Sequence, residues 1–148
     1  PPGPSARARK AAFTQACITH EVDALTVPGG DNVDAGFLAV RAGLPAGVDA
    51  LVCYNDQCAH GAILALLGDG LVPGRDMLVV GWDDSAIASS RALSLTSIDR
   101  APSRVASLAV DQAIARALSD GGSPARQRVD TELVVRASTG QPRGTNCP

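Results

Sequence analysis

Amide and carboxylate side chains follow two short apolar runs in the middle of the chain. Asn55 and Asp56 come just after a Leu-Val-Cys run. Asp83 and Asp84 come just after a Leu-Val-Val run. Such runs, without polar alternation, are typical of strands buried on both faces of a sheet. Parallel strands end at one edge of an α/β sheet, where such sheets bind ligands. Carboxylates there could hold Mg²⁺, whereas mixed amides and carboxylates could bind a hydroxyl-rich ligand.

A magnesium site is the first candidate function for the three carboxylates. Phosphoacceptor domains of flavodoxin-like topology hold Mg²⁺ at strand ends, but they also need a Lys late in the sheet. The only Lys in this chain is Lys10, near its beginning. A Mg²⁺-dependent phosphoacceptor or phosphatase is therefore disfavoured, and we predict no metal site. Asp56 and Asp84 are expected to cap helices or turns instead.

Nucleophilic catalysis lacks a suitable set of residues. The Gly-x-Ser-x-Gly elbow is missing, and neither His20 nor His60 follows a strand at a position suited to a general base. The sequence therefore predicts a protein that is not an enzyme, with no catalytic residue and no cofactor. Recognition of a ligand is what the remaining polar side chains favour. The candidates, which combine amides with one carboxylate and one guanidinium, are Asn55, Gln57, Asp83 and Arg100.

The composition is that of an ordinary globular domain. The 148 residues are 45% hydrophobic, with a net charge of −2 and no run of membrane-spanning length. This charge excludes the basic footprint of a nucleic-acid binder. The opening Pro1-Pro2-Gly3-Pro4 has no apolar region typical of a signal peptide. The cysteines lack metal-ligand spacing and are expected to be free thiols in a reducing cytoplasm; they are Cys17, Cys53, Cys58 and Cys147.

The hydrophobic pattern predicts alternating helices and strands around a central βαβ unit. In that unit Asn55 or Asp56 caps a helix whose inward face has helical spacing; this face consists of Ala59, Ala62, Ile63 and Leu66. Other helices are expected at residues 5–20, 33–42 and 102–120. Strands are expected at residues 22–27, 51–53, 78–80, 95–98 and 128–135. The result is an α/β fold with a mostly parallel sheet.

Four stretches, in their order and spacing, resemble the lactose-repressor/galactose-repressor family of bacterial transcription regulators. They are residues 53–62 (Cys-Tyr-Asn-Asp-Gln-Cys-Ala-His-Gly-Ala), 79–84 (Val-Val-Gly-Trp-Asp-Asp), 95–98 (Leu-Thr-Ser-Ile) and 132–140 (Glu-Leu-Val-Val-Arg-Ala-Ser-Thr-Gly). Residues 5–13 also resemble a helix opening of that family, and the resemblance covers about residues 3–140.

The resemblance implies a three-layer α-β-α core of the type I periplasmic-binding-protein kind, with an effector between two lobes. Residues 1–100 and 128–140 would form most of the C-terminal lobe, residues 101–120 a helix of the partner lobe, and residues 141–148 a tail. DNA would be bound only through an N-terminal helix-turn-helix domain outside this chain. The effector contacts that the resemblance implies are Ser5, Arg9, Asn55, Gln57, Asp83 and Arg100.

The same resemblance implies a homodimer. Its interface would use the outer face of residues 57–67, including His60, and the loop of residues 87–95, including Ile87 and Arg91. The family often places an aromatic ring against a sugar just after Gly30-Asp31, but here Asn32 follows. Arg100 stands where a smaller polar residue is common, so both a sugar and an anionic metabolite are open as effectors.

Two further expectations depend on this assignment. A periplasmic sugar-binding protein of a transporter shares the fold and is the alternative function, but the motifs at residues 55–57 and 81–84 favour the regulator. If the partner lobe is absent, the helix at 102–120 exposes an apolar side, and the chain alone is expected to be less stable than a two-lobed core.

Overall fold

Four strands form one sheet in the order β1-β2-β3-β4, in a computed structural model that describes residues 3–118 and 126–140. β1–β2 and β2–β3 pair in parallel, whereas β3–β4 is antiparallel. The mostly parallel α/β sheet predicted from the sequence is thus confirmed. The elements, in chain order, are α1 (Pro4–Thr19), α2 (Val33–Arg41), β1 (Ala50–Val52), α3 (Asp56–Gly68), β2 (Leu78–Trp82), β3 (Thr96–Asp99), α4 (Pro102–Leu118), β4 (Glu132–Val134) and the 3₁₀ turn η1 (Ala137–Thr139).

Asparagine side chains fix the starts of two helices. The Ala35 amide donates to Oδ1 of Asn32 (2.9 Å) at the start of α2. The Cys58 amide donates to Oδ1 of Asn55 (2.8 Å) at the start of α3. Both satisfy a helix-terminal N–H that would otherwise lack a partner. α4 begins at Pro102, as the sequence predicts, because a first-turn proline loses no hydrogen bond.

The core lies between α3 and the sheet. The predicted inward face of α3 is buried, and it packs with Val79 of β2 and with Leu95. Full burial of a side chain such as Leu66 contributes about 2 kcal/mol relative to an exposed one. α2 packs closely on α3, since a Cβ at Gly36 would collide with the Cys58 carbonyl and a Cβ at Gly61 with the Val33 carbonyl.

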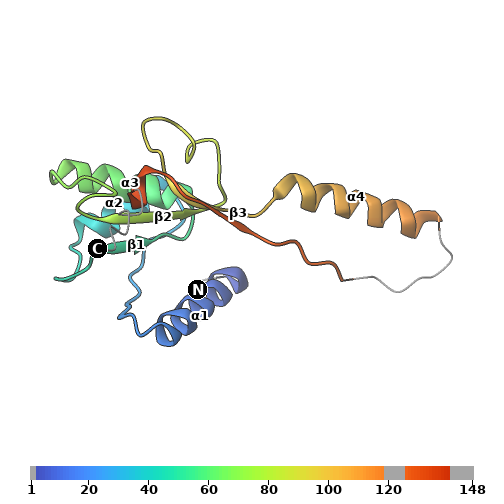
Figure 1. Cartoon of the computed structure of the whole chain (residues 1–148), viewed down its shortest axis with the longest axis horizontal. Helices are drawn as coiled ribbons and strands as arrows, with labels where there is room; N and C mark the ends of the chain where they lie inside the picture. The colour runs from blue at the N-terminus through green and yellow to red at the C-terminus, as the bar shows by residue number, and fades with distance from the viewer. Residues whose placement is uncertain (1–2, 119–125, 141–148) are drawn as a thin grey trace, which may run out of the picture.

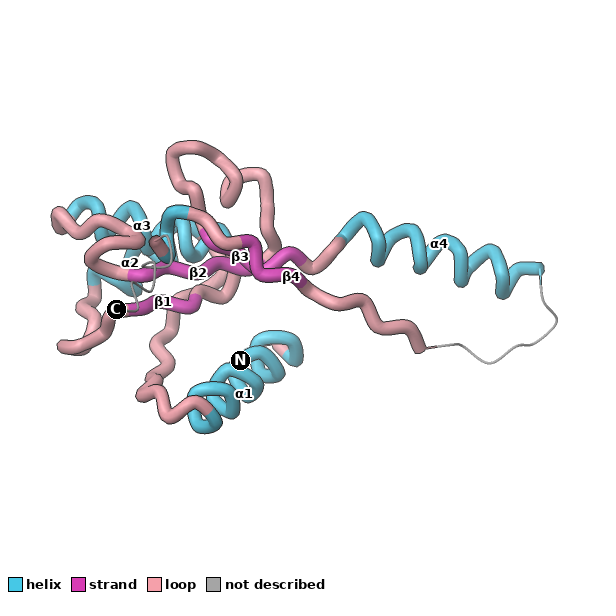
Figure 2. Tube along the Cα trace, viewed as in Figure 1, coloured by secondary structure: helices cyan, strands magenta, loops and turns pink. Residues whose placement is uncertain are grey.

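α1 and α4 stand outside this packed unit. Neither helix has a buried residue. Figure 1 shows α4 running away from the sheet and α1 set apart from it, while α2 and α3 lie together at the sheet. Figure 2 gives the same arrangement by element type. On α4 the exposed apolar side chains are Val105, Val110, Ile114 and Leu118.

The predicted strand at residues 22–27 is wrong. These residues are loop, and Val22, Leu25 and Val27 are all exposed. Their apolar alternation is that of a strand, but no described strand beyond β1 offers the hydrogen bonds that a strand requires. The last strand is also shorter than predicted, covering Glu132–Val134. The predicted end of the 102–120 helix, the Gly121-Gly122 break and the tail at 141–148 lie outside the described residues.

No helix in the described part of the chain combines the length and the apolar character that crossing a membrane requires.

Candidate ligand-binding site

The carboxyl ends of the three parallel strands bring the predicted ligand residues to one edge of the sheet. Val52 of β1 pairs with Val80 of β2, and Trp82 pairs with Ile98 of β3. Asn55, Asp83 and Arg100 all follow these strand ends. The parallel register therefore confirms the predicted common edge.

Arg9 reaches this edge from α1. Its Nη1 donates to the Tyr54 carbonyl (2.7 Å), and its Nη2 donates to Oγ of Ser5 (3.2 Å). The guanidinium also lies against two aromatic rings, 4.5 Å from the Tyr54 centroid and 4.6 Å from the Trp82 centroid. Cation–π contacts of this kind stabilise a guanidinium without neutralising its charge. Among the described residues, no carboxylate forms an ion pair with Arg9.

The aromatic pair is a feature that the sequence reasoning missed. Tyr54 and Trp82 are the only Tyr and Trp in the chain. Each stands two residues after a member of the Val52–Val80 pair, so Tyr54, just beyond β1, and Trp82, at the end of β2, occupy equivalent positions. That equivalence is the sequence signal from which the aromatic pair could have been predicted. Because both rings face Arg9, the two aromatic side chains and the cation form one unit at the sheet edge.

Asp83 and Arg100 form an ion pair, with 2.8 Å between Oδ1 and Nε. Both side chains remain partly exposed, at 32% and 52%, although Oδ1 of Asp83 is itself buried. Asp83 has φ = +109° and Asp84 has φ = +44°, a left-handed conformation rare for residues other than glycine. Such outliers persist only where the surroundings hold them, and they gather at functional sites.

Asn55 and Gln57 differ in how far the protein uses them. Asn55 caps α3, and its Nδ2 also donates to the Asp31 carbonyl (2.8 Å). Its amide therefore holds the loop before α2 against the start of α3. Gln57 is exposed in the first turn of α3. Asn55 has a structural role that limits its freedom toward a ligand, whereas Gln57 is accessible.

Asp56 was predicted to cap a helix or turn; Asn55 caps α3, whereas Asp56 accepts a backbone N–H of the turn that follows β2. The Asp56 carboxylate is buried, with 1% of its surface exposed. Its Oδ2 accepts from the amide and the hydroxyl of Ser85 (both 2.7 Å), and its Oδ1 accepts from the Ser97 hydroxyl (2.6 Å). A Cβ at Gly81 would collide with Oδ1 of Asp56, so the glycine leaves room for the carboxylate.

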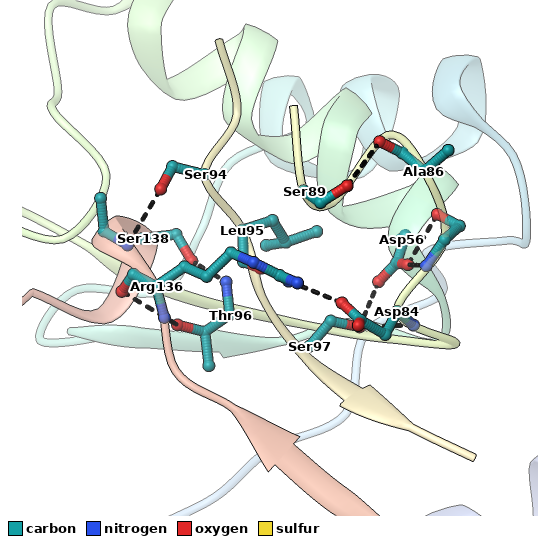
Figure 3. A network of polar contacts seen from close by, with 12 residues as sticks. Asp56, Asp84, Ala86, Ser89, Ser94, Leu95, Thr96, Ser97, Arg136 and Ser138 are labelled. Carbon is teal, nitrogen blue, oxygen red and sulfur yellow. Dashed lines mark hydrogen bonds and ion pairs between the residues drawn. The ribbon is translucent and has the colours of Figure 1, made fainter. Parts of the chain in front are cut away.

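Asp84 caps no helix either. Its Oδ1 pairs with Nη1 of Arg136 (2.6 Å), which comes from the C-terminal end of the described chain. Figure 3 shows this ion pair beside the contacts of Asp56. The expected cap is wrong for Asp84, because its carboxylate pairs instead with a residue 52 positions away in the sequence.

The three predicted dimer residues come from α3 and from the loop that follows β2. His60 is half-buried on α3, and its Nδ1 is a buried atom without a hydrogen-bond partner among the described residues. Ile87 is half-buried and Arg91 exposed in the loop after β2, which Ser85 ties to the start of α3. The dimer interface stays a prediction.

Two cysteine thiols lie close to the residues of the sheet edge. Cys53 directly follows β1, and Cys58 lies in the first turn of α3. Cys58 donates from Sγ to the Gly29 carbonyl (3.2 Å). A hydrogen bond from the Cys53 thiol lowers the pKa of Cys58 to about 7, against an opposing effect of burial. The same hydrogen bond, with burial, raises the pKa of Cys53 well above its usual value. The proton therefore stays on Cys53 while Cys58 ionises.

Other candidate sites are weaker. The described residues contain no group of three or more His, Cys, Asp or Glu side chains arranged for a metal ion. A cavity of about 250 Å³ lies where α4 begins, between Asp99, Arg104 and residues 128–132. It contains none of the predicted ligand residues, and both acidic and basic side chains line it. The edge at Arg9 and Asp83 remains the best candidate.

Comparison with known proteins gives a consistent result. Residues 2–139 match the family described as periplasmic binding protein-like domain. The chain is 28% identical over 140 residues to the "Probable HTH-type transcriptional repressor ExuR" of Bacillus subtilis, covering 90% of this chain and 42% of that protein. It is 30% identical over 139 residues to the lactose operon repressor of Escherichia coli, covering 91% of this chain and 38% of that protein.

Solved structures agree. A LacI-type transcription regulator from Bifidobacterium animalis subsp. lactis matches with a TM-score of 0.82 and 32% identity, covering 93% of this chain and 51% of that one. The lac repressor dimer bound to operator and the anti-inducer ONPF matches with a TM-score of 0.78 and 26% identity, covering 93% of this chain and 42% of that one. This chain spans less than half the length of those curated relatives.

Proposed function

We propose, from the premise that this chain belongs to the periplasmic binding protein-like family and to its LacI-type branch, that it is the effector-binding and dimerisation part of a bacterial transcription repressor. In this role the chain binds a small molecule and catalyses no reaction. The effector changes the balance between lobe arrangements only by its different affinity for each. Relatives are named as transcription regulators, so the transporter alternative is not proposed.

One observation carries the proposal: a cation, a carboxylate and a second cation stand at the ligand-binding edge of a parallel sheet. Arg9, Asp83 and Arg100 come from three separate elements, and only the folded chain assembles them. Open α/β sheets bind ligands at this edge. Asn55 and Gln57 lie beside these groups, in the cap and first turn of α3, and Ser5 supports Arg9.

The lobe assignment belongs to the same proposal. Residues 1–100 and 128–140 would form most of the C-terminal lobe, and α4 would pack in the partner lobe. The supporting observation is that α4 exposes Val110, Ile114 and Leu118 by 57%, 53% and 83%. A helix that exposes several large apolar side chains needs a cover.

The effector is proposed to be sugar-like or an anionic metabolite. Asp83 can accept hydrogen bonds from sugar hydroxyls. Arg9 retains its positive charge without a carboxylate partner in the described residues, which favours a ligand with a carboxylate or phosphate. A comparison of each neutral sugar with its acidic derivative therefore distinguishes the two classes of effector.

Calorimetric titration of a protein containing both lobes tests the proposal. The panel consists of D-glucose, D-galactose, their uronic acids, their phosphates and nucleosides. Arg9→Ala and Asp83→Asn should each weaken binding about tenfold or more, because a buried ligand group loses its partner. Arg75→Ala is the matched control, since Arg75 forms an exposed pair with Asp76 elsewhere. A ligand that binds equally well to all four proteins lies outside this edge.

Dimerisation is proposed through the outer face of α3 and the loop after β2. Leu64 and Leu67 are exposed by 43% and 51%, and together with His60 they recur at helical spacing. An apolar stripe on a helix is typical of an interface, and closed twofold dimers are the commonest oligomers.

DNA would be bound by a separate helix-turn-helix domain. A DNA-bound regulator of this kind would act in the bacterial cytoplasm.

A further inference from the structure

The turn after β2 is held in an unfavourable backbone conformation. Asp83 and Asp84 both have positive φ, and neither is a glycine. A β-carbon makes this conformation costly, so the turn would relax if its surroundings allowed it. Glycine would adopt this conformation more easily, but it could not form the ion pairs of these two side chains. Asp83 pairs with Arg100, and Asp84 pairs with Arg136.

Successive amides of this turn are each held by a different group. The Asp83 amide donates to the Ile98 carbonyl (3.0 Å), the Asp84 amide to Oγ of Ser97 (3.1 Å), and the Ser85 amide to Oδ2 of Asp56 (2.7 Å). The holders come from β3 and from the start of α3. The backbone of the turn is therefore fixed to the sheet and to the helix at once.

Arg136 adds a side-chain anchor from the far end of the chain. Its Nη1 donates to Oδ1 of Asp84 (2.6 Å) and to the Leu95 carbonyl (2.8 Å). Its own backbone is fixed by Thr96, whose Oγ1 accepts from the Arg136 amide (2.8 Å). Both side chains of the Asp84–Arg136 pair are less than one-fifth exposed. Solvent screens such a pair less than it screens a surface pair, and Figure 3 shows Arg136 reaching along Leu95 to Asp84.

We propose that Arg136 is a positioning residue for the ligand site, which acts through Asp84 to keep the carboxylate of Asp83 at the sheet edge. This inference rests on the proposed function, in which Asp83 contacts the effector. Without the ion pair, no hydrogen bond or ion pair from the described residues fixes the Asp84 side chain, and the turn loses one of the forces that oppose its relaxation. Asp83 directly precedes Asp84. A change of φ at either residue therefore turns the Asp83 carboxylate away from Arg100.

Trp82 provides a ligand-free measurement. It is the only Trp in the chain and directly precedes Asp83, so its fluorescence reports on the turn. Asp84→Asn is the sharper variant, because asparagine tolerates positive φ and only the charge is lost. Arg136→Gln removes the other partner, and Arg136→Lys keeps the charge. We expect acrylamide quenching of Trp82 to rise for the first two variants and to be partly restored by the third.

Arg75→Gln is the matched control, since it breaks the exposed Arg75–Asp76 pair and should leave Trp82 unchanged. Circular dichroism of every variant checks that the fold persists. If Asp84→Asn and Arg136→Gln leave Trp82 quenching at the wild-type value, Arg136 does not hold the turn and the inference is overturned, whatever the ligand.

The ligand measurement separates positioning from general stability. The probes are D-glucose and D-glucuronate, titrated into a protein containing both lobes. For the probe that binds, Arg136→Gln should weaken affinity about tenfold, but should have no further effect when Asp83→Asn is already present. An equal loss in both backgrounds overturns the positioning role. If no member of the wider panel binds the wild type, the proposed function fails, while Trp82 quenching still decides whether Arg136 holds the turn.

Discussion

The Nε atom of Arg100 lies 2.8 Å from Oδ1 of Asp83, so two residues predicted to contact a ligand already have each other as partners. An effector that uses either group must share it or replace it. Both side chains are partly exposed, and ion pairs between partly exposed side chains contribute within about 1 kcal/mol to stability. Its substitution should therefore be visible in binding far more than in folding.

Asp83→Asn and Arg100→Gln should have different effects on affinity. Asp83→Asn is expected to weaken a hydroxyl-bearing ligand about tenfold or more, because an acceptor-only carboxylate becomes an amide that can oppose a donor. Arg100→Gln is expected to be milder, or to favour a neutral sugar, because it frees Asp83. Calorimetry gives the affinities and thermal unfolding the stabilities. A large fall in melting temperature with unchanged affinity would contradict this assignment.

Asn55→Ala is expected to reduce stability by about 1 kcal/mol, because α3 loses its cap. Asn55→Asp should keep the cap through its carboxylate oxygen but lose the donor that holds the Asp31 carbonyl. Asn32→Ala removes the corresponding cap of α2. It serves as the control for the loss of a helix cap at a residue that is not predicted to contact the ligand. Urea unfolding measures all three. If Asn55→Ala changes only ligand affinity, the side chain acts in binding rather than as the cap.

Dimer formation should depend on the outer face of α3. Leu64→Glu and Arg91→Glu place a charge on that face or reverse one beside it, and each should raise the dissociation constant at least about tenfold. Leu38→Glu is the control, because Leu38 is a more exposed leucine on α2, outside the proposed interface. Sedimentation velocity over a concentration series gives the constant. A monomeric wild type, or a dimer insensitive to both changes, would exclude this interface.

Cys58 should ionise near pH 7. The thiol hydrogen bond from Cys53 lowers its pKa to about 7, so the folded state favours the thiolate more than the unfolded state does. A lowered pKa stabilises the fold at high pH, and the contribution is lost as pH falls toward 7. The stability difference between wild type and Cys58→Ser should therefore grow from pH 7 to pH 9.

The thiolate can be followed directly by its ultraviolet absorbance, in a background of Cys17→Ser and Cys147→Ser. Adding Cys53→Ser should change the midpoint, because a hydroxyl replaces the thiol donor. Adding Cys53→Ala should move it toward the usual cysteine value, since the donor is removed. A midpoint near 9 in the presence of Cys53 would show that the two thiols do not interact.

The elements predicted correctly are those with local signals. Asn55 followed by the apolar positions of α3 specifies a cap and a buried face within a few turns, and the neighbouring runs specify β1 and β2. The strand at 22–27 was wrong because a strand depends on a partner that the local pattern cannot supply. The Asp84–Arg136 pair spans 52 positions, so no periodicity predicts it. The positive φ of Asp83 is likewise set by surrounding contacts and not by its residue type.

α4 has 17 residues and buries none of them. An isolated helix of that length is marginal in water, because most helical stability in proteins comes from packing. Its amides should thus exchange hydrogen close to the rate of an unprotected chain, while those of α3 exchange only through larger openings. Any molecule or lobe that covers Val110 and Ile114 would slow that exchange by the free energy of docking. The exchange rate of α4 is therefore a direct thermodynamic measure of what packs against this chain, and it requires no knowledge of the effector.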